Sequence, residues 1–256
     1  MSVVDFHAYV GNWPYWSVPH ADETGHGLLG LMDRFGVEMA LVTSLKSVFY
    51  DVAEGNEIVF QLADQYHDRL IPAPVVNPRA EPNVRFAVTR LIERGAKAIY
   101  LFPFYHGYRL RSDWAPLGET LRAACALGCP VVIPLRLLMN WGFPTINVES
   151  VLKLAKEFGE GKFVVAGFNY GEFTDVVEGC KSSENIWLET SGLTMMRGVE
   201  LLVEQLGPSR IVCGTAMPLQ YPGCGLIKVR EAFLPDEQKE MIFNRNAVKL
   251  LAGVGQ

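Results

Sequence analysis

Residues 115–135 read APLGETLRAACALGCPVVIPL, a helix pattern followed by a strand pattern with one glycine between them. Apolar residues recur at spacings of four and three over Leu117, Leu121 and Ala124, which is typical of an amphipathic helix. Gly128 lies where a helix C-cap is expected, and the apolar run after it has the length of a buried strand. The segment therefore predicts a helix packed on a strand of a parallel sheet.

The same alternation extends over the whole chain. Short apolar runs predict strands at Val3–Phe6, Glu38–Ser44, Leu70–Val76, Ala96–Phe102, Pro130–Leu135, Lys162–Gly167, Ile186–Thr190 and Ser209–Cys213. Segments of helical period predict helices at Thr24–Phe35, Asn56–Tyr66, Pro82–Arg94, Ala115–Leu127, Val148–Phe158, Phe173–Lys181, Met195–Leu206 and Asp236–Leu251.

Eight strands alternating with eight helices in 256 residues predict a (β/α)8 TIM barrel. The alternative is a doubly wound open sheet, which loses support because no G-x-G-x-x-G motif follows the first strand. No low-complexity linker or shift in composition divides the chain, so we expect a single domain over residues 1–256.

The charge balance points away from polyanionic partners. Lys and Arg total 23 against 28 Asp and Glu, a net charge of −5, and no basic run is present. Nucleic acids and anionic membrane surfaces are therefore not expected partners. No apolar run has the length of a membrane-spanning helix, and no basic region precedes Val3-Val4, so we expect a cytoplasmic protein.

The string Asp5-Phe6-His7-Ala8-Tyr9 after the first predicted strand resembles the D-x-H-x-H opening of the amidohydrolase superfamily, in its amidohydrolase-related branch. The resemblance continues in order along the chain, through Val76-Asn77-Pro78, LETSGL at 188–193, RIVCGT at 210–215 and Asn244-Arg245-Asn246-Ala247.

This resemblance implies one or two divalent metals in the barrel mouth, held by histidines after strands one, five and six, with an aspartate after strand eight. The metal would activate water for attack on an ester, lactone or amide, or polarise a carboxylate for decarboxylation. His7 is present, but Tyr9, Pro134, Asn169 and Ala216 stand where the other groups are expected. We therefore expect no metal, although the sequence leaves open a single divalent ion such as zinc in a rebuilt site with His7, Glu172 or Cys213.

Four residues are candidates for proton transfer because they lie at predicted strand ends, where barrel enzymes place reactive groups. His7 is a candidate base, with a buried structural histidine as the equal alternative, and Tyr9 is a candidate donor or a core tyrosine. His106 lies in an aromatic loop, FPFYHGY at 102–108, that would stack a planar ligand or simply pack. Glu172 is a candidate acid or base, or a structural ion-pair partner.

The substrate-binding candidates lie at the same predicted end of the barrel. Arg136 has the planar fork that matches a carboxylate or phosphate, although an internal pair with Glu172 or Glu189 is the alternative. Asn169 would help Tyr9 to stabilise an oxyanion. The remaining candidates are Tyr105, Asn140, Glu189 and Thr215.

Two functional hypotheses follow. The first is an amidohydrolase-like hydrolase or lyase, independent of metal, that acts on a small and anionic carbonyl or carboxylate compound. The second is a catalytically silent relative that binds a small ligand or a protein partner. Barrels of this branch are often dimers, so the resemblance also suggests a homodimer.

Overall fold

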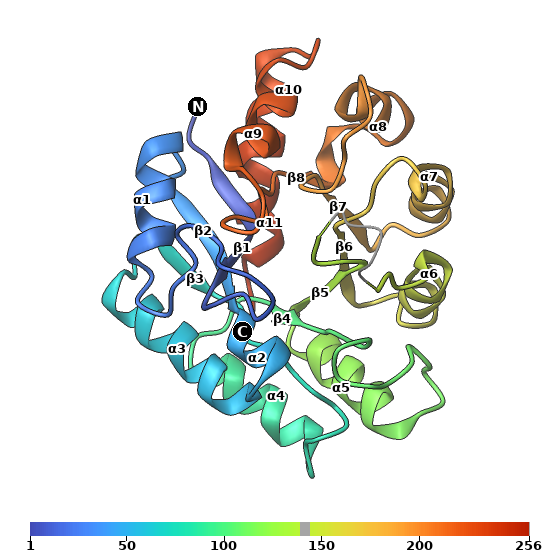
Figure 1. The fold of residues 1–256 in the computed structure, drawn as a ribbon. Coiled ribbons are helices and arrows are strands. Elements are labelled where there is room, and N and C mark those ends of the chain that lie inside the picture. The colour runs from blue at the N-terminus through green and yellow to red at the C-terminus, as the bar shows by residue number, and fades with distance from the viewer. Residues whose placement is uncertain (139–143, 256) are drawn as a thin grey trace.

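The computed structural model describes residues 1–138 and 144–255. Within them the chain forms a barrel of parallel strands surrounded by helices (Figure 1), which confirms the predicted (β/α)8 fold. The strands are β1 Val4–Val10, β2 Met39–Ser44, β3 Leu70–Pro72, β4 Ile99–Tyr100, β5 Pro130–Pro134, β6 Lys162–Ala166, β7 Ile186–Glu189 and β8 Ile211–Val212.

The barrel consists of two hydrogen-bonded sheets, β1-β2-β3 and β4-β5-β6-β7-β8. Single bridges join them, Val75 to Tyr100 on one side and Ala8 to Met217 on the other. Next to the second bridge the Ala216 N–H donates to the His7 carbonyl at 2.8 Å. Three backbone hydrogen bonds cross each seam and close the ring, and His7 lies at one of them.

The helices cover the outside of the barrel (Figure 1). They are α1 His26–Phe35, α2 Leu45–Phe49, α3 Val52–Gln65, α4 Val84–Glu93, α5 Ala115–Ala126, α6 Val148–Glu157, α7 Phe173–Ser182, α8 Gly198–Leu206, α9 Pro222–Arg230, α10 Asp236–Glu240 and α11 Asn246–Leu251, with short turns η1 Pro208–Arg210 and η2 Met241–Arg245.

The core divides into two buried clusters. The outer cluster fills the space between strands and helices, with Val42, Val131 and Ile133 among its members. The inner cluster fills the barrel, and Leu41 and Val132, the neighbours of these residues in sequence, belong to it. Because successive strand residues point to opposite faces, each strand supplies both clusters.

Several element boundaries differ from the sequence prediction. The strand predicted to end at Phe6 continues to Val10. The helix predicted over Asp236–Leu251 is divided into α10 and α11 by the π-helical turn η2. Helices α2 and α9 were not predicted, because each is short and lacks a clear apolar period. No helix among the described residues is long and apolar enough to cross a membrane.

Candidate active site

An irregularity in β1 brings His7 and Tyr9 together. The pairing of β1 with β2 shifts register between Asp5 and Ala8, and such a bulge re-aims the side chains that follow it. Tyr9 packs in the inner core, with its ring centroid 4.9 Å from that of His7. His7 is 1% exposed and Tyr9 0%.

Glu189, His7 and Tyr9 form a hydrogen-bonded chain. Nδ1 of His7 lies 2.9 Å from Oε2 of Glu189, and Nε2 of His7 is hydrogen-bonded to the Tyr9 hydroxyl. An ionised carboxylate only accepts, so Nδ1 donates to Glu189. In the neutral imidazole Nε2 then accepts the Tyr9 proton, and the three groups form a path for a proton toward His7.

The environment of Glu189 keeps it ionised. Burial alone raises the pKa of a carboxyl, but the charge that His7 carries as an imidazolium, the hydrogen bond from His7 and those from Ser191 outweigh burial and lower the pKa of Glu189. The Ser191 hydroxyl donates to Oε2 at 2.7 Å, and the Ser191 N–H donates to Oε1. A buried carboxylate with these donors is suited to stabilise an imidazolium at His7.

Lys228 of α9 fixes the loop that follows Glu189. Its ammonium donates to the carbonyl oxygens of Thr190, Ser191 and Leu193 at 2.7, 2.9 and 2.9 Å. Burial lowers the pKa of Lys228, against the charge of Glu189, which raises it. All three ammonium protons are directed at this loop, so Lys228 holds Ser191 against the Glu189 carboxylate.

Asp5 lies on the same strand as His7 and Tyr9 and links it to Thr215, which follows β8. It accepts hydrogen bonds from the backbone N–H groups of His7 and Thr215, both at 3.0 Å, and from the Thr215 hydroxyl. Burial raises the pKa of Asp5 to about 7, although these hydrogen bonds act in the opposite direction. Thr215, a binding candidate from the sequence, is 1% exposed and joins Asp5 to the N–H of Met217.

Three buried polar atoms at this end of the barrel have no hydrogen-bond partner among the described residues: the hydroxyls of Thr43 and Tyr105 and Nδ1 of His106. Thr43 pairs in register with Tyr9 and shares the inner face of β2 with Leu41. The other ring nitrogen of His106 contacts the Ser47 carbonyl at 3.1 Å, and burial lowers the pKa of His106. Unpartnered buried groups of this kind are suited to a polar ligand or water.

An aromatic cap, defined here as Trp13, Phe49 and Tyr105, packs against the same inner core as Tyr9. The Phe49 ring lies edge-on to both others, with centroids 5.3 Å from Trp13 and 5.1 Å from Tyr105. Trp13 is only 5% exposed. The cap therefore belongs to the packed structure, and His7 and Tyr9 are buried with it.

Arg136, Asn169 and Glu172 form a second, separate group. The guanidinium of Arg136 makes a two-point ion pair with Glu172, with one N–O distance of 3.1 Å, as the alternative interpretation of Arg136 predicted. Glu172 also accepts from the Asn169 N–H at 3.0 Å, and the pair with Arg136 holds its pKa below the usual value despite partial burial. No hydrogen bond or ion pair in the described residues joins this group to His7. The candidate Asn140 lies outside the described residues.

The described residues at the barrel mouth form no ready set of ligands for the metal that the resemblance implies. Both ring nitrogens of His7 are engaged, by Glu189 and Tyr9. Cys213 is buried in the outer core, and Glu172 pairs with Arg136. Among the described residues no three His, Cys, Asp or Glu side chains are grouped to hold a metal. A tight zinc site needs three or four such donors.

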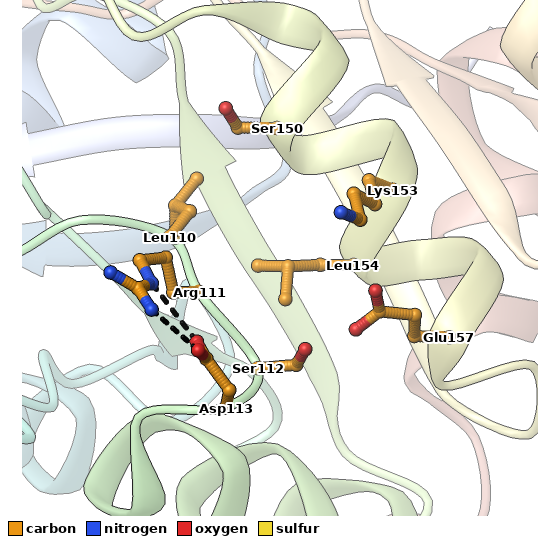
Figure 2. A pocket seen from close by; sticks show the side chains of 8 residues that line it. All are labelled: Leu110, Arg111, Ser112, Asp113, Ser150, Lys153, Leu154 and Glu157. Carbon is orange, nitrogen blue, oxygen red and sulfur yellow. Dashed lines mark hydrogen bonds and ion pairs between the residues drawn. The ribbon is translucent and has the colours of Figure 1, made fainter.

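Four hollows on the described surface have no lining residue from the Glu189–His7–Tyr9 chain. Figure 2 shows one of about 390 Å³ between α6 and the segment before α5. Its lining residues are Leu110, Arg111, Ser112, Asp113, Ser150, Lys153, Leu154 and Glu157.

Sequence reasoning missed Thr43, Ser191 and Lys228. Thr43 had a usable signal, because it is a polar residue at an inward position near the end of a predicted strand. Ser191 follows Glu189 by two residues, a spacing that lets its N–H and hydroxyl reach the carboxylate. Lys228 had no signal, since its role depends on α9 packing beside the β7 loop.

Comparisons with known proteins agree with this architecture. Residues 48–252 match the family model described as Amidohydrolase. No curated protein matches the sequence.

Solved structures with the same fold cover nearly the whole chain. A 5-carboxyvanillate decarboxylase from Novosphingobium aromaticivorans, with bound manganese and 3-methoxy-4-hydroxy-5-nitrobenzoic acid, is 14% identical over 98% of this chain and 97% of its own, with a TM-score of 0.77. A 2,6-dihydroxybenzoate decarboxylase from Rhizobium is 13% identical over 98% of both chains, with a TM-score of 0.77.

A probable 2-pyrone-4,6-dicarboxylic acid hydrolase from Acinetobacter baumannii, with citric acid bound, is 13% identical over 98% of this chain and 99% of its own, with a TM-score of 0.71. At these identities the structures establish the fold. The family model spans well over half of the chain, and the chain therefore belongs to the amidohydrolase family.

Proposed function

We propose that this protein is a hydrolase or lyase that acts on a small carbonyl or carboxylate compound at the barrel mouth, without a bound metal. The observation that carries the proposal is the Glu189–His7–Tyr9 chain, in which a carboxylate orients an imidazole and the imidazole accepts from a hydroxyl. This is the arrangement of a general-base relay. The structural neighbours that decarboxylate or hydrolyse small carboxylic acids suggest the substrate class.

In hydrolysis the relay would activate a water molecule. Tyr9 takes a proton from the water while its own hydroxyl proton passes to Nε2 of His7, and the hydroxide adds to the substrate carbonyl. The imidazolium is stabilised by Glu189, and the same proton returns to the leaving group in the second half of the reaction. In a decarboxylation His7 would start as the imidazolium: Tyr9 would donate its proton to the carbon that loses CO₂, and the proton on Nε2 of His7 would pass to the Tyr9 oxygen, which leaves His7 neutral.

The unpartnered hydroxyls of Thr43 and Tyr105 supply donors for the substrate oxygen. Arg136 could anchor the substrate carboxylate only in competition with Glu172, because Glu172 already pairs with the guanidinium. Tyr9 is 0% exposed, so substrate would reach its hydroxyl only if side chains that bury it move aside during turnover. The aromatic cap packs with the inner cluster that contains Tyr9 and is the candidate to move.

Burial of the relay favours a second candidate, a silent relative that binds a ligand or partner without chemistry. His7 and Tyr9 are 1% and 0% exposed, which is also the environment of structural residues. The two candidates differ in whether any substrate turns over and in whether Tyr9 matters for turnover.

The test measures turnover of lactones, esters and aromatic carboxylic acids by untagged protein purified without chelators, after elemental analysis for zinc, manganese, iron and nickel. We expect activity that survives EDTA and falls by about 10²-fold or more in Tyr9→Phe and His7→Gln. Tyr66→Phe is the matched control, because it removes a phenol hydroxyl at the end of α3, remote from the relay.

Near one metal per chain, with activity lost in EDTA and restored by that metal, would overturn metal independence. Activity that Tyr9→Phe leaves unchanged would overturn the relay. Saturable ligand binding without turnover across the panel would favour the silent relative.

A further inference from the structure

A second hollow on the surface has the composition of an anion site. It measures about 460 Å³ and lies between the loops after β3 and β4. We name it the arginine hollow, and it is lined by Arg79, Gly107, Tyr108, Arg109, Arg111, Asp113 and Trp114.

Positive charge predominates in the arginine hollow. Three guanidiniums face one carboxylate, within a chain whose net charge is −5. Arg111 makes a two-point pair with Asp113, with one N–O distance of 3.0 Å. Arg109 is exposed and has no hydrogen bond or ion pair in the described part of the chain. An entering anion would therefore meet one uncommitted guanidinium directly.

Arg79 is held at the edge of the hollow by the backbone. One guanidinium nitrogen donates to the Gly107 carbonyl at 2.7 Å, which leaves the rest of the fork for another acceptor. Gly107 has φ +66°, and a Cβ there would lie 3.0 Å from the same nitrogen. The turn thus needs glycine both for its backbone conformation and for the approach of Arg79.

The opposite wall is aromatic. The rings of Tyr108 and Trp114 lie 5.5 Å apart between centroids, at 36°, and both pack against the outer core. The Tyr108 hydroxyl is buried without a partner among the described residues. A planar ligand ring would meet a fixed apolar surface here, and its polar substituents would meet guanidiniums.

The neighbouring hollow of Figure 2 provides an internal comparison. It shares Arg111 and Asp113 with the arginine hollow, but adds Lys153 and Glu157. Its two positive groups therefore balance its two negative groups, and it contains no aromatic residue. Of these two hollows, only the arginine hollow has more cationic than anionic side chains and contains aromatic residues.

We propose that the arginine hollow binds a small oxyanion, a carboxylate or a phosphate, that carries a planar ring. The Glu189–His7–Tyr9 chain contributes nothing to this site, so the proposal is independent of the proposed reaction. Arg109 and Arg79 would hold the oxyanion, and Tyr108 with Trp114 would contact the ring.

Isothermal titration with benzoate and phenyl phosphate tests the site, because the two probes share one ring and differ only in the oxyanion. Benzyl alcohol supplies the ring without the charge, and acetate and inorganic phosphate supply the charge without the ring. We expect at least one ring-bearing oxyanion to bind more tightly than all three partial probes, and its Kd to rise with added salt. The stronger of the two identifies the oxyanion.

Arg109→Gln and Arg79→Gln should each raise the Kd of that probe about 10-fold, the cost of losing a hydrogen bond to a charged group. Arg85→Gln on α4 is the matched control, because Arg85 is an exposed arginine outside the hollow, and it should leave the Kd unchanged. His7→Gln should also leave it unchanged. The proposal is overturned if no probe binds at millimolar concentration, if Arg109→Gln has no effect, or if His7→Gln abolishes binding.

Discussion

Gly214 faces Glu189 so closely that a Cβ atom on residue 214 would lie 1.9 Å from Oε1 of the carboxylate. The glycine follows β8, the strand next to β7, whose last residue is Glu189. Its missing side chain is the space that the carboxylate occupies beside His7. The geometry of the Glu189–His7–Tyr9 chain therefore depends on a residue outside that chain.

Gly214→Ala should displace Glu189 and lower the free energy of unfolding by about 1–3 kcal/mol, the usual cost of overpacking a core. Urea denaturation measures this change. Gly30→Ala is the control, because Gly30 lies within α1 with nothing near its Cβ position, and alanine there should stabilise by about 0.5–1 kcal/mol. Equal effects of the two substitutions would contradict the packing argument.

Asp5→Asn should change how stability depends on pH. The folded-state pKa of about 7 lies above the ordinary value of 3.8, so the folded protein binds this proton more tightly than the unfolded chain. The stabilisation of the folded state by this proton is fully present below about pH 4 and is lost as pH rises through about 7. Its full size is about 4 kcal/mol at most.

Asparagine does not titrate, so Asp5→Asn should gain stability relative to the wild type between pH 4 and pH 7. Urea denaturation across that range measures the difference. The lowered pKa of Glu189 has the opposite effect on stability. The stability that Glu189 contributes is lost as pH falls below the pKa of this residue in the unfolded chain, so the effect of Glu189 appears in a separate pH range. Parallel stability curves for Asp5→Asn and the wild type would show that Asp5 is already ionised in the folded state.

Lys228→Met should destabilise the protein by about 3 kcal/mol or more, because it leaves three buried carbonyl oxygens without their donor. The loss should appear as faster amide exchange in the loop after β7, where Ser191 is located. Lys249→Met removes an exposed lysine of α11 and should change stability by less than about 0.5 kcal/mol. A thermal denaturation midpoint equal to that of Lys249→Met would exclude a holding role for Lys228.

The pair of Arg136 and Glu172 should show measurable coupling in a double-mutant cycle with Arg136→Met and Glu172→Leu. The side chains are 9% and 18% exposed, so each single substitution strands a poorly hydrated charge, and a coupling of about 1–3 kcal/mol is expected. The cycle for Lys181 and Glu178, at 42% and 66% exposed, should give less than about 0.5 kcal/mol. Equal coupling in the two cycles would mean that burial does not strengthen the Arg136 pair.

The outline of the barrel could be predicted from the sequence because the spacing of apolar residues along the chain indicates which face of each helix or strand is buried. Each predicted strand overlaps an observed one, and Gly36 and Gly207 end α1 and α8 as expected. The end of β1 was wrong because the apolar alternation changes phase at the bulge, where His7 and Tyr9 follow Phe6. A bulge is fixed by the neighbouring strand, which the local pattern does not describe.

The site was predictable only as a set of positions. Strand-end reasoning selected His7, Tyr9 and Glu189, and the structure brings them together. It also selected Arg136, Asn169 and Glu172, which form a group of their own. Contact between two candidates depends on the direction of their side chains and on the position of each strand around the barrel. The residue type alone predicts neither.

The two seams of the barrel give the bond between His7 and Glu189 a mechanical meaning. His7 belongs to the three-stranded sheet and Glu189 to the five-stranded one, and three backbone hydrogen bonds cross the seam between these sheets. The imidazole and the carboxylate thus act as a clasp between the two sheets. The hydrogen bond between them therefore adds a side-chain link to the backbone bonds that hold the two sheets together at this seam.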